Sequence, residues 1–136
     1  MLDLVHRRDR PRSEPTQWAL SLARWTSAVV FIVFGIGKFV NHASETASFS
    51  SYGLPAPGVF TVVIGLVELL GGVLLLAGAF SRWVALLLAG DMVGAIVVSG
   101  IGRGETVSLT LAPALLIAMV ALIVLGPGRA AAGPRL

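Results

Sequence analysis

The sequence predicts an all-α fold, an integral membrane antiparallel four-helix bundle, from three observations. Hydrophobic residues make up 56% of the 136 positions and charged residues only 12%, whereas a soluble domain usually carries about a quarter charged residues. Four apolar segments each reach about 20 residues, the length that a helix needs to cross a bilayer. Their apolar runs are continuous and lack the alternation of barrel strands. The chain is therefore expected in a lipid bilayer.

The predicted helices are separated by connections of different kinds. The segments run from residues 18–40, 58–80, 83–101 and 107–125. Residues 41–57 form a long connection rich in Ser and Thr that ends in Pro55-Ala56-Pro57, and we predict an outward-facing loop there. The two other connections are short, which makes successive helices antiparallel neighbours.

The basic residues predict one membrane domain, 18–126, between two cytoplasmic tails, 1–17 and 127–136. Lys38 and Arg103 flank one side of the bundle. The opposite side has seven arginines, which are Arg7, Arg8, Arg10, Arg12, Arg82, Arg129 and Arg135. Loops rich in Lys and Arg stay on the cytoplasmic side. We therefore expect a multi-pass protein of the plasma membrane with both termini in the cytoplasm.

Ionisable side chains inside the apolar segments are the candidate site. Glu68 stands alone near the middle of the second segment, Arg24 lies in the first and Asp91 in the third. A charged group at the bilayer centre costs about 2.5–3.5 kcal/mol on insertion scales. Lys38 is fourteen residues beyond Arg24, or about 21 Å along a helix. We expect Lys38 to extend to the interface without a partner, whereas Arg24 needs a counter-charge.

Small residues indicate how these groups face the bundle. Gly65, Gly71 and Gly72 share a helix face with Glu68, and small residues let helices approach closely in membranes. Asp91 shares its face with Gly94 and Ala95, which predicts a second helix contact. We expect Arg24 to pair with Glu68 and to leave Asp91 less well paired. The predicted intramembrane polar cluster is Arg24, Lys38, Glu68 and Asp91.

Other chemistries are excluded or disfavoured by composition. The chain has no cysteine, which excludes a thiol nucleophile, an iron–sulfur cluster and thiolate metal sites. Its two histidines, His6 and His42, lie outside the apolar segments, and we expect no metal site. The basic residues are too scattered to form a nucleic-acid groove.

Several motifs, in this order along the chain, resemble the DoxX family of small bacterial membrane proteins. They are Arg24 followed by Gly35-Ile36-Gly37-Lys38, then Gly53-Leu54-Pro55-Ala56-Pro57, Val67-Glu68-Leu69-Leu70-Gly71-Gly72, Phe80-Ser81-Arg82, and Met92 with Gly94-Ala95-Ile96. The resemblance covers residues 24–101 and implies a four-helix membrane protein. Relatives in this family include a subunit of a thiosulfate:quinone oxidoreductase and members of oxidative-stress complexes. Arg24, Lys38 and Glu68 match charged positions of the family, and Asp91 is not assigned.

Three functional hypotheses remain open at this stage. The first is a membrane subunit of a redox complex, not catalytic alone and without a cofactor of its own, which binds quinone or docks a soluble redox protein. The second is a membrane scaffold or assembly factor with a purely structural ion pair. The third is a small proton-coupled transporter, which needs a homo-oligomer to form a pathway. The first follows from the resemblance, and none involves nucleic acid.

Overall fold

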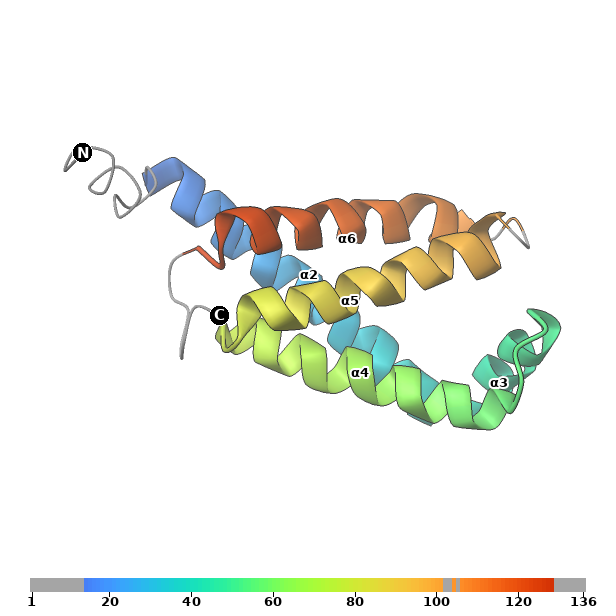
Figure 1. The fold of residues 1–136 in the computed structure, drawn as a ribbon. Helices are drawn as coiled ribbons and strands as arrows, with labels where there is room; N and C mark the ends of the chain where they lie inside the picture. Colours follow the sequence, from blue (N-terminus) through green and yellow to red (C-terminus); the bar gives the residue numbers. More distant parts are fainter. Residues whose placement is uncertain (1–13, 102–103, 105, 129–136) are drawn as a thin grey trace.

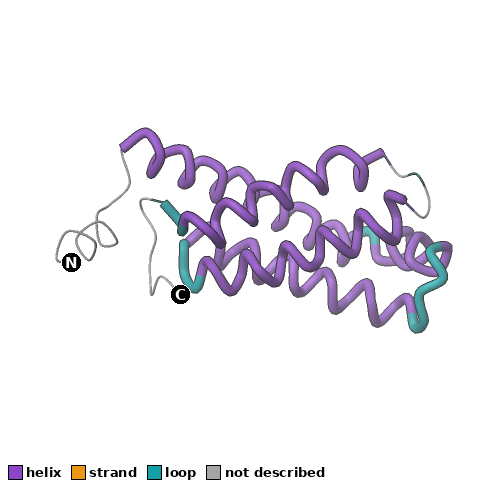
Figure 2. Tube along the Cα trace, turned by 45° about the horizontal axis from the view of Figure 1, so that its top comes forward, coloured by secondary structure: helices purple, strands orange, loops and turns teal. Residues whose placement is uncertain are grey.

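The computed structural model describes residues 14–101, 104 and 106–128, and these are almost entirely helical. Figures 1 and 2 show long helices side by side with the loops gathered at their two ends. The all-α prediction is confirmed. The elements are α2 (Glu14–Val40), α3 (His42–Ser51), α4 (Pro57–Ala77), α5 (Ser81–Ala95), a π-helical continuation η1 (Ile96–Ile101) and α6 (Thr106–Leu125).

Three helical segments are long and apolar enough to cross a membrane. They are Glu14–Val40, Pro57–Ala77 and Ser81–Ile101, and the apolar part of α6, Leu109–Leu125, is shorter. A membrane protein is therefore supported, while the four spans and their orientation stay predictions. The tails at residues 1–13 and 129–136, and the turn containing Arg103 and Glu105, lie outside the described residues.

Residues 41–57 contain a helix where a loop was expected. The stretch from His42 to Ser51 forms α3, and it contains neither glycine nor proline to interrupt a helix. Its Ser and Thr residues are only mildly unfavourable in a helix, so its composition alone did not justify the loop prediction. Pro57 then starts α4, because a proline in the first turn removes no helical hydrogen bond.

The glycines that share a face with Glu68 lie at close helix contacts, as predicted: Gly65 and Gly72 pack against α2, and Gly71 faces Leu88 of α5. A Cβ atom added to Gly72 would lie 2.8 Å from Ile32 Cγ1 and 3.0 Å from the Ala28 carbonyl oxygen. One added to Gly65 would lie 3.1 Å from Lys38 Cβ. On the α2 side, Gly35 lies directly against the backbone of Leu69. These contacts set the register between the two antiparallel helices.

The helices α4 and α5 meet at a tight turn and separate toward α3. Gly78, with φ of 78°, caps α4 in the left-handed conformation, and α5 begins three residues later. Figure 1 shows the two helices close together at this turn and far apart at their other ends, where α3 lies. α6 packs on α5 and α2. The central core includes Phe31, Leu75, Leu88, Met119 and Leu122.

Candidate functional site

Arg24 holds the chain that follows α6 and does not pair with Glu68. Its side chain is fully buried, and Nη1 donates a hydrogen bond of 2.7 Å to the carbonyl oxygen of Pro127. The neighbouring Gly128 packs so closely that an added Cβ would lie 2.6 Å from the Gln17 carbonyl oxygen. Arg24 thus fastens residues 126–128 to the first half of α2. The predicted Arg24–Glu68 pair is wrong.

The register of α2 against α4 explains this error. Gly35 lies against Leu69, so Glu68 faces the second half of α2. Arg24 precedes Gly35 by eleven residues, which is about 16 Å along a helix. It therefore lies beside the end of α4 and the turn into α5. The sequence prediction placed Arg24 and Glu68 at similar depths by counting residues from the helix ends. It did not include the offset between α2 and α4.

Glu68 pairs instead with Lys38. The Lys38 Nζ atom lies 2.8 Å from Glu68 Oε1, and their side chains are 11% and 4% exposed. The Lys38 ammonium also lies 5.9 Å from the centre of the Phe34 ring, within the range of a cation–π contact. The expectation that Lys38 reaches the interface without a partner is wrong. The pair joins α2 to α4.

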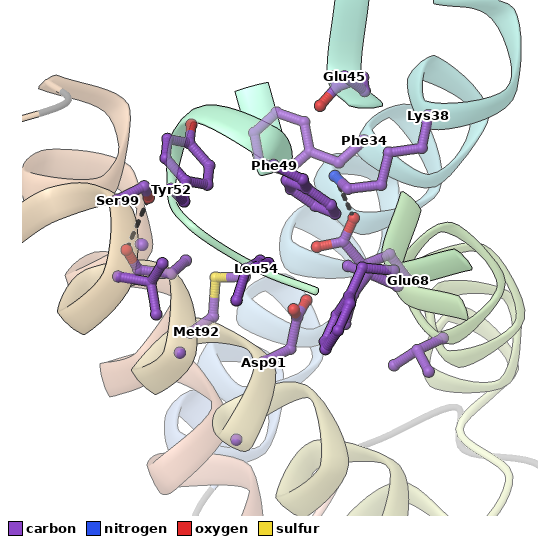
Figure 3. Close-up of a pocket in the computed structure, with 18 of the residues that line it drawn as sticks. Phe34, Lys38, Glu45, Phe49, Tyr52, Leu54, Glu68, Asp91, Met92 and Ser99 are labelled. Carbon is purple, nitrogen blue, oxygen red and sulfur yellow. Dashed lines mark hydrogen bonds and ion pairs between the residues drawn. The ribbon is translucent and has the colours of Figure 1, made fainter. Parts of the chain in front are cut away.

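Asp91 lies on α5, on the other side of the gap from this pair. Figure 3 shows its carboxyl group between α5 and the Lys38–Glu68 pair, and it interacts electrostatically with both of those residues. Asp91 Oδ2 is buried and accepts no hydrogen bond from the described residues. The structure therefore brings together three of the four predicted charged residues and leaves Arg24 apart.

These three side chains lie on the wall of a large cavity. Its volume is about 1070 Å³, and it occupies the space where α4 and α5 separate, with α2 behind it and α3 at its wide end. Among the described lining residues, Lys38 is the one cation and faces three acids, Glu45, Glu68 and Asp91. Aromatic side chains also line it, namely Phe34, Phe49, Tyr52, Phe60 and Trp83.

The hydroxyl and charged groups of the cavity lie toward α3 and at its centre, whereas the end near the turn between α4 and α5 is apolar. The α3 end has a carboxylate and hydroxyl groups, from Ser44, Glu45, Ser48, Tyr52 and Ser99. The opposite end is lined on α5 by Trp83, Leu86 and Leu87. Lys38, Glu68 and Asp91 lie between. The site therefore suits an amphiphile with a polar head and an apolar chain.

Sequence reasoning missed the contribution of α3 and misjudged one face of α5. Glu45, Phe49 and Tyr52 line the cavity, and none of them was among the predicted site residues. The spacing of Glu45, Phe49 and Tyr52 is that of one helix face, which was the available signal. Gly94 was expected in a helix contact, but an added Cβ there would have no atom within 4 Å. Gly94 lines the cavity instead.

The chemistry available at this site is hydrogen bonding and proton transfer. The Lys38 ammonium can donate up to three hydrogen bonds, and the two carboxyl groups can accept them or carry a proton. Within the described residues, no three His, Asp or Glu side chains gather closely enough to hold a metal ion. Buried ionisable groups inside apolar helices commonly mark ligand or proton sites.

Comparison with known proteins identifies a family. The DoxX family model matches residues 19–100. A protein of Bacillus subtilis (strain 168), named "Putative oxidoreductase CatD", is 37% identical over 76 residues, which cover 56% of this chain and 55% of that protein. The chain thus spans about half the length of this relative. No solved structure gives a significant match.

Proposed function

Because the chain belongs to the DoxX family, we propose that it is the membrane subunit of a redox system and binds a quinone in the cavity between α4 and α5. The observation that carries this proposal is the cavity itself. It presents an ion pair, Lys38–Glu68, whose side chains are 11% and 4% exposed, and a further carboxyl group, Asp91, to a mostly apolar space of about 1070 Å³. Small-molecule sites commonly combine apolar walls with a few convergent polar groups.

The residues present fit the two ends of a quinone. Lys38 can donate a hydrogen bond to a carbonyl oxygen of the ring, and the Asp91 carboxyl group lines the same cavity. The aromatic and aliphatic walls can hold the ring and the chain. A bound quinone supplies two-electron redox chemistry, which cofactors rather than side chains usually provide.

The chain's own residues would bind and orient the quinone and exchange protons with it. Glu68 holds the Lys38 ammonium in place through a contact of 2.8 Å. Asp91, which lines the same cavity, is the residue whose carboxyl group we assign to holding or releasing a proton. Electrons would come from another protein of the redox system, so the chain is not catalytic alone. A soluble redox partner and a homo-oligomer belong to this proposal, as does a plasma-membrane location with both termini in the cytoplasm.

The main alternative is a scaffold in which the ion pair only joins helices. A purely structural pair is expected to be enclosed by helix packing, as Arg24 is. The Lys38–Glu68 pair instead lines a cavity together with a second carboxyl group. This placement favours ligand binding, although the pair also joins α2 to α4. No feature of the described residues favours the transporter in the same way.

Tryptophan fluorescence provides a direct test, because Trp83 lines the cavity whereas Trp18 and Trp25 do not. The double variant Trp18→Phe/Trp25→Phe leaves Trp83 as the single tryptophan of the chain. In lipid nanodiscs, ubiquinone or menaquinone should quench its emission with a saturable dependence on concentration. An isoprenoid alcohol without the quinone ring is the control. Quenching that rises linearly and never saturates would contradict the proposal.

A further inference from the structure

One side of the cavity is open along α5. Gly90 and Gly94 line it and are exposed, and a Cβ atom added to either would meet no heavy atom within 4 Å. Leu86 and Leu87 lie on the same wall and are 55% and 56% exposed. This side would face lipid if α5 spans the bilayer. Near Asp91, the backbone of α5 is thus not covered by side chains on this side.

The wide end of the cavity is closed by α3. The Thr46 hydroxyl on α3 lies 3.0 Å from the Thr61 hydroxyl on α4, and Thr61 is fully buried. The Phe49 and Tyr52 rings, 6.0 Å apart, lie on the cavity side of α3. Figure 3 shows Phe49 beside the Lys38–Glu68 pair and Tyr52 near Ser99. A ligand coming from water at this end would have to displace α3.

We propose that the ligand reaches the cavity sideways from the bilayer, between α4 and α5, and passes Gly90 and Gly94. Its polar head then lies toward α3, beside Lys38, Glu68 and Asp91. Its apolar chain lies along Leu86, Leu87 and Trp83 and extends into the lipid. The ligand class is therefore an amphiphile with a long apolar chain, and a chainless, water-soluble molecule is not expected to bind well. This inference rests on the proposed function, because it concerns the same site.

The shape of the cavity carries this inference. Glycines with free space beside them lie on one side of the wall. Among the described lining residues, the charged side chains lie toward α3 and at the centre. An apolar chain next to exposed leucines replaces protein–lipid contacts with similar ones, whereas a polar head at that position would lack hydrogen-bond partners. The head is therefore expected at the end with the hydroxyl and carboxyl groups.

Leucine at the two glycines tests the route. Gly90→Leu and Gly94→Leu should each fill the opening and weaken quinone binding by about tenfold or more, a change in Kd that titration resolves readily. Gly37→Leu is the matched control, because its added Cβ also meets no atom within 4 Å and Gly37 does not line the cavity. Binding is measured by quenching of Trp83 in the single-tryptophan background. Unchanged affinity in both α5 variants would overturn the route.

A disulfide between α3 and α4 gives an independent test, even if a leucine variant fails to fold. Thr46→Cys/Thr61→Cys places two thiols where the two hydroxyl groups lie 3.0 Å apart. The chain has no other cysteine. When oxidation forms the disulfide and fixes α3 to α4, the protein should bind quinone at the same rate as its reduced form. Slower binding after oxidation, restored by reduction, would show that the ligand passes α3 and would overturn the lateral route.

Two further comparisons separate the route from the proposed function. A quinone ring without its chain should bind at least about tenfold more weakly than the chain-bearing form. Equal affinity would refute the assignment of the chain to Leu86, Leu87 and Trp83. If the unmodified cavity shows no saturable binding of any quinone, the proposed function itself fails. If binding is saturable, its affinity is unchanged by the glycine substitutions and its rate falls when the disulfide holds α3 in place, only the lateral route is refuted.

Discussion

Two cations of α2, the fully buried Arg24 and the partly buried Lys38, lie on the same helix but have different surroundings. Arg24 is fully buried and donates to the backbone carbonyl of Pro127, in a place enclosed by the chain that follows α6. Lys38 pairs with a carboxylate on the wall of a cavity that also contains Asp91. Burial of a charge inside an apolar helix therefore does not by itself identify a ligand site. The space that the charge faces distinguishes the two cases.

The chemistry of each side chain suits its place. Arginine has five donors and stays charged at any accessible pH, so it can hold backbone carbonyl oxygens permanently. Lysine carries a compact charge with donors that rotate, and it can share them between Glu68 and a ligand. If this contrast is correct, changes at Arg24 affect stability alone, whereas changes around Lys38 affect stability and binding.

Removal of Glu68 should have the largest effect on stability. Glu68→Leu leaves the Lys38 ammonium buried without its partner, and breaking a buried pair from one side costs about 3–5 kcal/mol. Thermal unfolding of the purified protein in detergent measures the loss. The double variant Lys38→Met/Glu68→Leu removes both charges and should recover most of the stability. Equal instability of the single and double variants would contradict the pairing.

Arg24→Met should cost less, about 1.5–3 kcal/mol, because a hydrogen bond from a charged donor to a carbonyl is lost. Quinone affinity should stay within about twofold of the unmodified protein, because Arg24 does not line the cavity. Unfolding and quinone titration are measured on the same sample. A large loss of affinity at unchanged stability would reverse the roles assigned to the two cations.

Gly72→Ala should destabilise the protein by about 1–3 kcal/mol through overpacking. The new methyl group would lie 3.0 Å from the Ala28 carbonyl oxygen and force α2 and α4 apart. Gly37→Ala, where an added Cβ meets no atom within 4 Å, is the matched control and should be neutral or slightly stabilising. Similar unfolding temperatures for the two variants would contradict the close α2–α4 packing that positions Lys38.

Asp91→Asn should have the smallest effect on stability, within about 1 kcal/mol, because the amide keeps the size of the side chain and its capacity for hydrogen bonding. Turnover of quinone with a redox partner should fall by about a hundredfold or more if the carboxyl group exchanges protons. Asp91→Glu is the companion variant and should retain part of the activity. Full turnover in the asparagine variant would remove Asp91 from the proposed mechanism.

Local features of the site were predictable from the sequence, but the partners of its charged side chains were not. The glycine face around Glu68 was predicted correctly, because small residues at helical spacing identify a contact face without knowledge of the partner. The partner of Glu68 was predicted wrongly. The identity of this partner depends on the offset between α2 and α4, which is set by close contacts such as that of Gly35 with Leu69.

The amino-acid sequence by itself determined the fold class, the membrane character and the candidate charges, because these depend on composition and on the length of apolar runs. Only the tertiary structure decided that Arg24 holds Pro127 while Lys38, Glu68 and Asp91 share a cavity. It also decided that α3 lines that cavity and that Gly90 and Gly94 have free space beside them. The physical reason is that helix register and the divergence of α4 from α5 arise from contacts between residues far apart in the chain.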